Sequence, residues 1–118
     1  MPDNINQVAL TGNLTHDPKL VELPSGHVFS ELQLACHRRS RDELTGLWRE
    51  WPDYFTVKTF GFQARTTYEH LRKGQGIALS GRLSSRRTTK DDNEEGQPRH
   101  EVEIIAEVVQ FLSRPHRR

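Results

Sequence analysis

The segment Tyr-Phe-Thr-Val-Lys-Thr-Phe at residues 54–60 alternates between two kinds of side chain along its whole length. Successive side chains of a β-strand point to opposite sides, so this alternation predicts a strand with two chemically different faces. The odd-numbered residues can close a core, and the even-numbered ones place the aromatic rings of Tyr54 and Phe60 on either side of Lys58. Because aromatic residues are enriched in strands for packing reasons alone, the even-numbered face is open to two interpretations, burial or contact with a ligand.

The length and composition of the chain predict one small domain. Its 118 residues fall within the usual size of a single domain with a core of its own. Only 33% of the residues are hydrophobic and the mean hydropathy is -0.79, so the core coexists with long hydrated loops or part of the apolar surface is shared with another subunit. We therefore expect oligomerisation.

The sequence predicts a soluble cytoplasmic protein without a membrane partner. No apolar run approaches the roughly 18 residues that span a bilayer, and the first residues lack the basic and apolar regions of a signal peptide. The single cysteine, Cys36, excludes an intrachain disulfide and the usual zinc and redox motifs, although it can meet its own copy in a symmetric oligomer. We expect no metal and no cofactor.

Positive charge is concentrated in the middle of the chain. Residues 37–90 hold 12 Lys or Arg against 5 Asp or Glu, whereas residues 1–36 and 91–112 carry net charges of -3 and -6. Of the 17 cationic residues 13 are arginine, whose planar guanidinium suits phosphate contacts and stacking on bases. The alternative for any one arginine is a solvated surface of mixed charge.

Periodicity and turn residues predict an all-β domain with one helix. The expected elements are strands at residues 5–14 (with a kink at Gly12), 28–36 and 54–60, a helix at 62–73, and strands at 77–84 and 101–108, with a short extended piece at 19–22. Two long hairpin loops, at 37–53 and 84–100, complete the chain. This order is the plan of an OB-fold, a five-stranded Greek-key barrel whose sheet face and long loops bind oligonucleotides.

The helix is predicted from one apolar stripe. Ala64, Tyr68 and Leu71 recur at helical spacing, and Gly74 stands at the expected C-terminal stop.

The segment 37–53 reads as a basic hairpin that contains both tryptophans of the chain. A tryptophan on an arginine-rich loop is a candidate stacking platform, and it is also a candidate packing residue. Both interpretations stay open for Trp48, while Trp51, next to Pro52, is expected to pack.

Several short motifs together resemble the bacterial single-stranded DNA-binding protein family over about residues 4–112. The motifs are Asn6-Gln7-Val8-Ala9-Leu10-Thr11-Gly12-Asn13-Leu14, Asp17-Pro18, Pro24-Ser25-Gly26, Phe60-Gly61, Tyr68, Leu71-Arg72-Lys73-Gly74, Gly81-Arg82-Leu83 and Ala106-Glu107-Val108-Val109-Gln110-Phe111-Leu112. No single piece is specific, but their order and spacing are.

The resemblance implies an OB-fold domain at residues 1–112, followed by a short basic tail at 113–118. It further implies a homotetramer that wraps single-stranded DNA without base specificity, in DNA replication, recombination or repair and near the bacterial nucleoid, with no catalytic chemistry. In the family, aromatic residues at the positions of Tyr54 and Phe60 stack on bases, and basic residues at the positions of Lys73 and Arg86 line the path of the strand.

Together the residues and the resemblance define an expected site. Its stacking residues are Trp48, Tyr54 and Phe60. Its phosphate contacts are expected at Arg38, Arg39, Arg41, Arg49, Lys58, Lys73, Arg82, Arg86 and Arg87. Sequence-tolerant binding needs both kinds of contact, because every base has a π-face and every nucleotide a phosphate.

The chain departs from the family pattern in two respects. Ser40 and Thr88 stand where family members often have Trp, so we expect weaker stacking or stacking that shifts to Trp48 and other residues. The acidic C-terminal tip through which family members recruit other proteins is absent from residues 113–118, so either this sequence is a truncated form or it is a tail-less paralogue. For a tail-less paralogue, partners recruited through that tip are not expected.

Two other functions remain as alternatives, an RNA-binding OB module and an OB subunit that acts as a protein adaptor. An enzyme is not expected. The six histidines are scattered, and the adjacent pairs His16-Asp17 and Cys36-His37 would diverge on a strand rather than converge.

Overall fold

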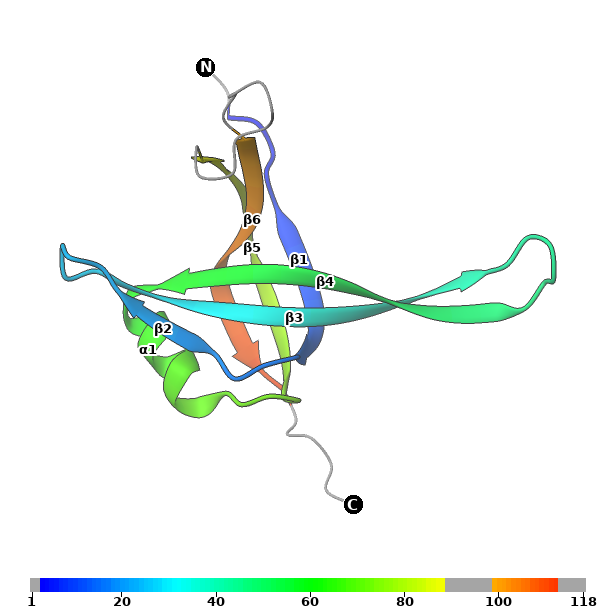
Figure 1. Ribbon diagram of the computed structural model, residues 1–118, viewed down its shortest axis with the longest axis horizontal. Helices are drawn as coiled ribbons and strands as arrows, with labels where there is room; N and C mark the ends of the chain where they lie inside the picture. Colours follow the sequence, from blue (N-terminus) through cyan, green and yellow to red (C-terminus); the bar gives the residue numbers. More distant parts are fainter. Residues whose placement is uncertain (1–2, 89–98, 113–118) are drawn as a thin grey trace.

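The computed structural model of the chain describes residues 3–88 and 99–112 (Figure 1). Its elements are β1 (Val8–Leu14), β2 (Lys19–Glu22), β3 (Val28–Arg41), β4 (Trp48–Phe60), α1 (Gly61–His70), β5 (Gly76–Thr88) and β6 (Arg99–Phe111). No helix within these two ranges is long and apolar enough to cross a membrane. The expected basic tail at residues 113–118 lies outside the described residues.

The strands form one sheet that closes on itself. Their hydrogen-bonded order is β1-β5-β6-β4-β3-β2, and β1 also pairs with β3, which completes a barrel of five strands with β2 on the outer edge of β3. Neighbouring strands are antiparallel except β4 and β6, which run parallel where Val57 meets Ile104. A closed β-barrel with one helix confirms the expected OB-fold, and the short extended piece at 19–22 proves to be a sixth strand.

The core lies inside the barrel and uses the odd-numbered residues of the segment 54–60. Val57 and Thr59 are fully buried, and Phe55 packs against the core from a partly buried position. The central cluster consists of Leu14, Leu32, Leu34, Val57, Leu71, Ile77, Leu79, Ile104 and Ala106. The alternation in the sequence therefore predicted correctly which side of β4 faces inwards.

Gly12 lies where β1 passes from its pairing with β5 to its pairing with β3. A Cβ atom at this position would stand 2.5 Å from the carbonyl oxygen of Ala35. Any larger residue would therefore push β1 away from β3 at the closure of the barrel, which explains the glycine in the middle of an otherwise regular strand.

The helix is shorter than expected, and its buried stripe includes the expected Ala64 and Leu71 but has Thr67 in place of Tyr68. It ends at His70 rather than residue 73, because Leu71 adopts an extended conformation and is completely buried in the core. The side chain of Arg72 then donates hydrogen bonds to carbonyl oxygens of the last helical turn. Ala64 and Thr67 face inwards, whereas Tyr68, which was expected on the buried stripe, is exposed.

The basic hairpin at residues 37–53 is a two-stranded arm that extends well beyond the barrel (Figure 1). The expected strands continue through it, with β3 reaching Arg41 and β4 beginning at Trp48, so that only residues 42–47 form the turn. The second expected loop is also shorter, because β5 and β6 stay paired as far as Thr88 and Arg99. Residues 89–98 lie outside the described part of the chain.

Candidate nucleic-acid interface

One side of the β3–β4 ladder gathers the three expected stacking residues. Directly opposed residues of an antiparallel pair point to the same side, and so do alternate residues along a strand. The register therefore places Trp48, Tyr54 and Phe60 on one side of the ladder. They are 60%, 69% and 47% exposed, which leaves their rings accessible.

A fourth aromatic residue, Phe29, lies opposite Phe60 on the same side. The two ring centroids are 5.9 Å apart and the planes are tilted by 49°, an arrangement that aromatic pairs favour. We call the side that carries Phe29, Trp48, Tyr54 and Phe60 the aromatic face. Phe29 is missing from the expected site, because alternation separates the two sides of residues 28–36 but only the register shows which side meets Phe60.

Lys58 lies on the aromatic face but is only 9% exposed. Its ammonium nitrogen is 2.9 Å from a carboxylate oxygen of Glu103 and 4.8 Å from the ring centroid of Phe29. The carboxylate and the ring together hold the charge in place. Contact between Lys58 and a phosphate stays a prediction, and the phosphate would have to compete with Glu103.

The aromatic face continues across β6 and β5 as a charged hollow of about 450 Å³. We call it the charged hollow, and it is lined by Glu31, Thr56, Lys58, Arg86, Glu101, Val102 and Glu103. A guanidinium nitrogen of Arg86 is 3.1 Å from Glu101, and this hydrogen bond raises the pKa of Arg86 above its ordinary value. Three carboxylates face two cations here, so the hollow is not a basic surface.

The arm places arginines against both tryptophans. The guanidinium carbon of Arg39 lies 5.4 Å from the ring centroid of Trp48, and Arg41 donates a hydrogen bond to the carbonyl oxygen of Gly46. All three side chains, those of Arg39, Arg41 and Trp48, stand on the aromatic face. This end of the face combines an exposed ring with two guanidinium groups that form no ion pair with any described residue, although Glu50 lies directly opposite Arg39 on the same side.

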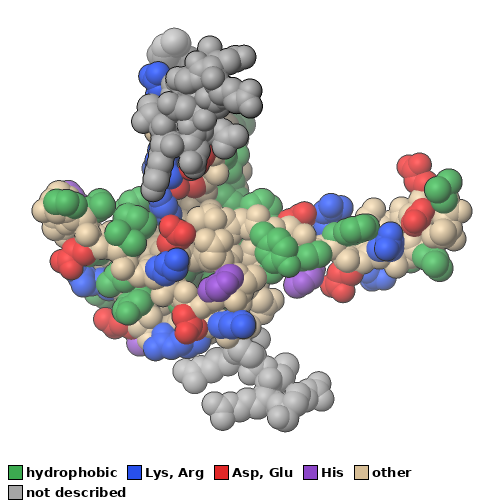
Figure 2. All heavy atoms as spheres, in the orientation of Figure 1, with side chains coloured by type: hydrophobic (Ala, Val, Ile, Leu, Met, Phe, Trp, Pro, Cys, Tyr) green, Lys and Arg blue, Asp and Glu red, His purple; other side chains and the backbone are tan. Residues whose placement is uncertain are grey.

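The opposite side of the arm carries the other expected arginines. Arg49 lies over the ring of Trp51 at 5.0 Å, and Arg38 forms a 2.9 Å ion pair with Asp53. Trp51 was expected to pack, but it is 41% exposed, because nothing within the described residues covers a two-stranded arm from outside. Figure 2 shows hydrophobic, basic and acidic side chains mixed along the whole arm.

The remaining expected cations are dispersed. Lys73 follows α1 and its backbone N–H donates to the carboxylate of Asp17, so it lies beside the β1–β2 turn rather than on the ladder. Arg87 is exposed on β5, opposite His100, and Arg82 lies 3.9 Å from Glu107. Of the nine expected phosphate contacts, Arg38, Lys58, Arg82 and Arg86 thus already have a carboxylate partner.

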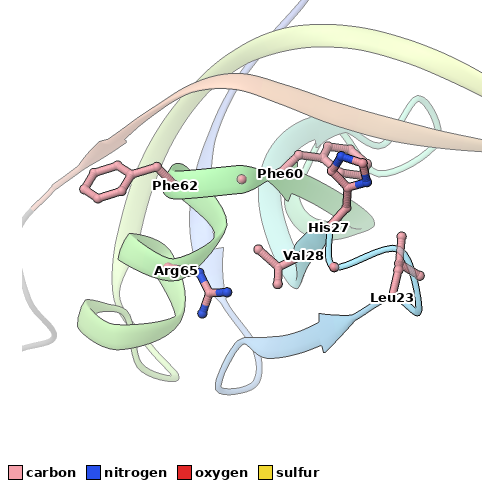
Figure 3. Close-up of a pocket in the computed structure, with 8 residues that line it drawn as sticks. Leu23, His27, Val28, Phe60, Phe62 and Arg65 are labelled. Carbon is pink, nitrogen blue, oxygen red and sulfur yellow. The ribbon is translucent and has the colours of Figure 1, made fainter.

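An apolar groove adjoins Phe60 on the side of the helix (Figure 3). We call it the Arg65 groove; it has a volume of about 760 Å³ and is lined by Leu23, Gly26, His27, Val28, Phe60, Gly61, Phe62 and Arg65. The groove lies between the β2–β3 turn and the start of α1. No sequence pattern indicated it, because it depends on how two segments nearly 40 residues apart pack together.

Other chemistry is sparse in the part of the chain that the structure covers. Among residues 3–88 and 99–112, no group of three or more His, Cys, Asp or Glu is placed so that it could hold a metal ion. The Cys36 thiol is free and partly buried. Burial raises the pKa of Cys36, and the negative charge of Asp53 raises it further.

A closed OB barrel that presents exposed aromatic rings beside arginines defines a class of domain suited to oligonucleotides. The model of the "Single-strand binding protein family" matches residues 5–112, and the chain belongs to this family.

Solved structures agree with this assignment. Wild-type single-stranded DNA-binding protein from Thermus aquaticus shares 37% identity with a TM-score of 0.76, and its deletion mutant delta 228-252 R190A shares 37% with a TM-score of 0.80. Each match covers 92% of this chain but only 50% and 51% of the Thermus chains, so this chain spans about half of their length. A Plasmodium falciparum SSB in complex with ssDNA shares the fold, with a TM-score of 0.82 and 22% identity. This match covers 96% of this chain and 99% of the Plasmodium chain.

Proposed function

We propose that the chain binds single-stranded DNA without base specificity. The bases stack on the aromatic face, and the phosphates are held by arginines of the arm. Three exposed aromatic rings on one side of a single ladder carry this proposal. Stacking of this kind accepts any base and contributes about 1–3 kcal/mol per base.

The distribution of ion pairs supports phosphate contacts along the arm. Arg39 and Arg41 stand beside Trp48 and form no ion pair with a described residue, whereas the cations of the charged hollow are paired with glutamates. The strand therefore gains most of its electrostatic attraction along the arm. Arg86 and Lys58 contribute only where a phosphate displaces Glu101 or Glu103.

The active form in this proposal is a homotetramer that protects single strands during replication, recombination or repair in the bacterial cytoplasm. Exposed apolar side chains on β5 and β6 support an assembly, because a monomer would leave them in water. They include Leu83, Val102, Val108 and Phe111.

Titration with oligo-dT of increasing length, at two salt concentrations, tests the proposal. Quenching of tryptophan fluorescence reports binding, and light scattering reports the mass of the complex. We expect a tetramer whose affinity falls as salt rises, by roughly 0.7 in the logarithmic slope for each phosphate contact. A monomer, or binding that does not depend on salt, would contradict it.

Two rival functions are separated by the same assay. An RNA-binding module would prefer oligo-U over oligo-dT in direct competition. A protein adaptor would show little quenching with either oligonucleotide, despite the exposed Trp48 and Trp51.

A further inference from the structure

The Arg65 groove combines an apolar wall with one unpaired positive charge, whereas the cations of the charged hollow are paired with glutamates. Its wall is apolar, with the side chains of Leu23, Val28 and Phe60, and no carboxylate lines it. Its single charged group is the guanidinium of Arg65, which has no hydrogen bond or ion pair with any residue that the structure describes. An apolar wall beside an unpaired guanidinium suits a base and its phosphate.

The groove is continuous with the aromatic face through one side chain. Phe60 packs against Phe29 on the aromatic face and also lines the groove. Figure 3 shows Val28 and Arg65 directed into the space between α1 and the β2–β3 turn, whereas Phe62 is directed away from it. A strand that stacks on Phe60 would reach this space without crossing an intervening element.

The walls of the groove are held in place by the backbone. The N–H of Leu23 donates to the carbonyl oxygen of His27, and the N–H of Gly26 donates to that of Leu23. Gly26 has a positive φ of 92°, which favours glycine and fixes the tight turn. A pre-formed groove of this size falls within the usual range of 300–1,000 Å³ for small-ligand sites.

We propose that the Arg65 groove is a nucleotide subsite for single-stranded DNA beyond Phe60. The base lies against Leu23 and Val28, and Arg65 binds the adjoining phosphate. This inference rests on the proposed function and extends the path of the strand from the sheet onto the helix side of the barrel. A purely apolar occupant would fill the groove but leave the Arg65 charge without a partner.

Charge-matched variants test the contribution of Arg65. Arg65→Ala and Arg72→Ala each remove one positive charge from the same region of the chain, but Arg72 is bound to carbonyl oxygens at the end of α1 and does not line the groove. With long oligo-dT we expect Arg65→Ala to reduce the logarithmic salt slope by about 0.7, and Arg72→Ala to leave it unchanged. With oligomers too short to pass Phe60, neither variant should differ from the wild type.

Photo-crosslinking locates the base directly. Oligo-dT carrying 4-thiothymidine is irradiated on the wild-type protein and the crosslinked peptides are identified by mass spectrometry. We expect crosslinks in residues 23–28 or 61–65 in addition to the segment 54–60. Thermal melting of both variants verifies that the fold is intact.

The outcomes separate this inference from the proposed function. Crosslinks confined to the arm and to residues 54–60, or equal slopes for Arg65→Ala and Arg72→Ala, would overturn the subsite and leave the proposed function standing. A change in tetramer mass caused by Arg65→Ala would also overturn it, because the groove would then be a subunit contact. Absence of any oligo-dT binding by the wild type would overturn both.

Discussion

The ammonium of Lys58 lies 2.9 Å from a carboxylate oxygen of Glu103, and the pair joins β4 to β6 where these strands run parallel. Their side chains are only 11% and 17% exposed. An ion pair this far from water holds two strands together, and it also withholds a cation from the surface that we propose for DNA.

The first prediction concerns stability. Glu103→Gln leaves the Lys58 ammonium poorly solvated and without its counter-charge, so we expect a loss of about 2–4 kcal/mol in the free energy of unfolding, near the range for a broken buried pair. Urea denaturation measures it. The double variant Lys58→Met with Glu103→Gln should recover part of the loss, since it removes the unpaired charge. A single variant as stable as the wild type would contradict this account.

The second prediction concerns the exposed pair of Arg86 and Glu101. Glu101→Gln releases Arg86 for a phosphate, so we expect tighter binding of oligo-dT and a logarithmic salt slope steeper by about 0.7. The stability should change by less than about 1 kcal/mol, because both side chains are half exposed. Glu69→Gln on α1 is the control for net charge and should leave the slope unaltered. Equal effects of the two variants would show that only the overall charge matters.

The third prediction concerns stacking. Tyr54→Ala and Phe60→Ala should each weaken binding by about 1–3 kcal/mol, to a similar degree for oligo-dT and oligo-dC, because the rings accept any base. Tyr68→Ala removes an exposed ring from α1 and should leave the affinity unchanged. Fluorescence anisotropy with labelled oligonucleotides measures all three. A loss confined to one base would indicate hydrogen-bonded recognition instead of stacking.

The fourth prediction separates the two sides of the arm. The chain has two tryptophans, so Trp51→Phe leaves Trp48 as the only reporter and Trp48→Phe leaves Trp51. We expect stronger quenching by short oligo-dT in the Trp51→Phe variant, because Trp48 stands on the aromatic face with Tyr54 and Phe60. Stronger quenching of Trp51 would place the strand on the opposite side of the arm.

The sequence predicted the barrel through the order of its strands and helix, and it predicted the two sides of the segment 54–60 through local alternation. The side that carries Val57 and Thr59 is buried, and the rings of Tyr54 and Phe60 are exposed. Alternation places Lys58 on the exposed side with Tyr54 and Phe60, but Lys58 is buried. Its partner Glu103 lies 45 residues away on a strand whose pairing with β4 no local pattern reveals.

The helix and the arm show two further limits. Apolar spacing selected Tyr68 for the buried stripe, but its neighbour Thr67 is buried instead. The small side chain of Thr67 fits there because its hydroxyl donates a hydrogen bond to the carbonyl oxygen of Ala64. Trp51 is a large ring beside a proline, which favours packing, but the arm extends past the barrel and places charged side chains beside the ring, with Arg49 over it and Arg38 opposite. Burial in both places depends on tertiary packing.

The fifth prediction concerns the thiol of Cys36, which reacts with iodoacetamide as the thiolate. Burial raises its pKa, and the charge of Asp53 raises it further, so alkylation of the folded protein should rise at a higher pH than that of the urea-unfolded chain. Asp53→Asn removes the negative charge near the thiol and releases Arg38 from its ion pair with Asp53. Both changes favour the thiolate. The variant should therefore react faster at a given pH, while the remaining effect of burial keeps it slower than the unfolded chain.

Asp42→Asn, a change of the same charge in the turn of the arm, is the control and should leave the pH profile of Cys36 alkylation unaltered. Identical pH profiles for the wild type and Asp53→Asn, with the fold intact by thermal melting, would show that Asp53 does not act on this thiol.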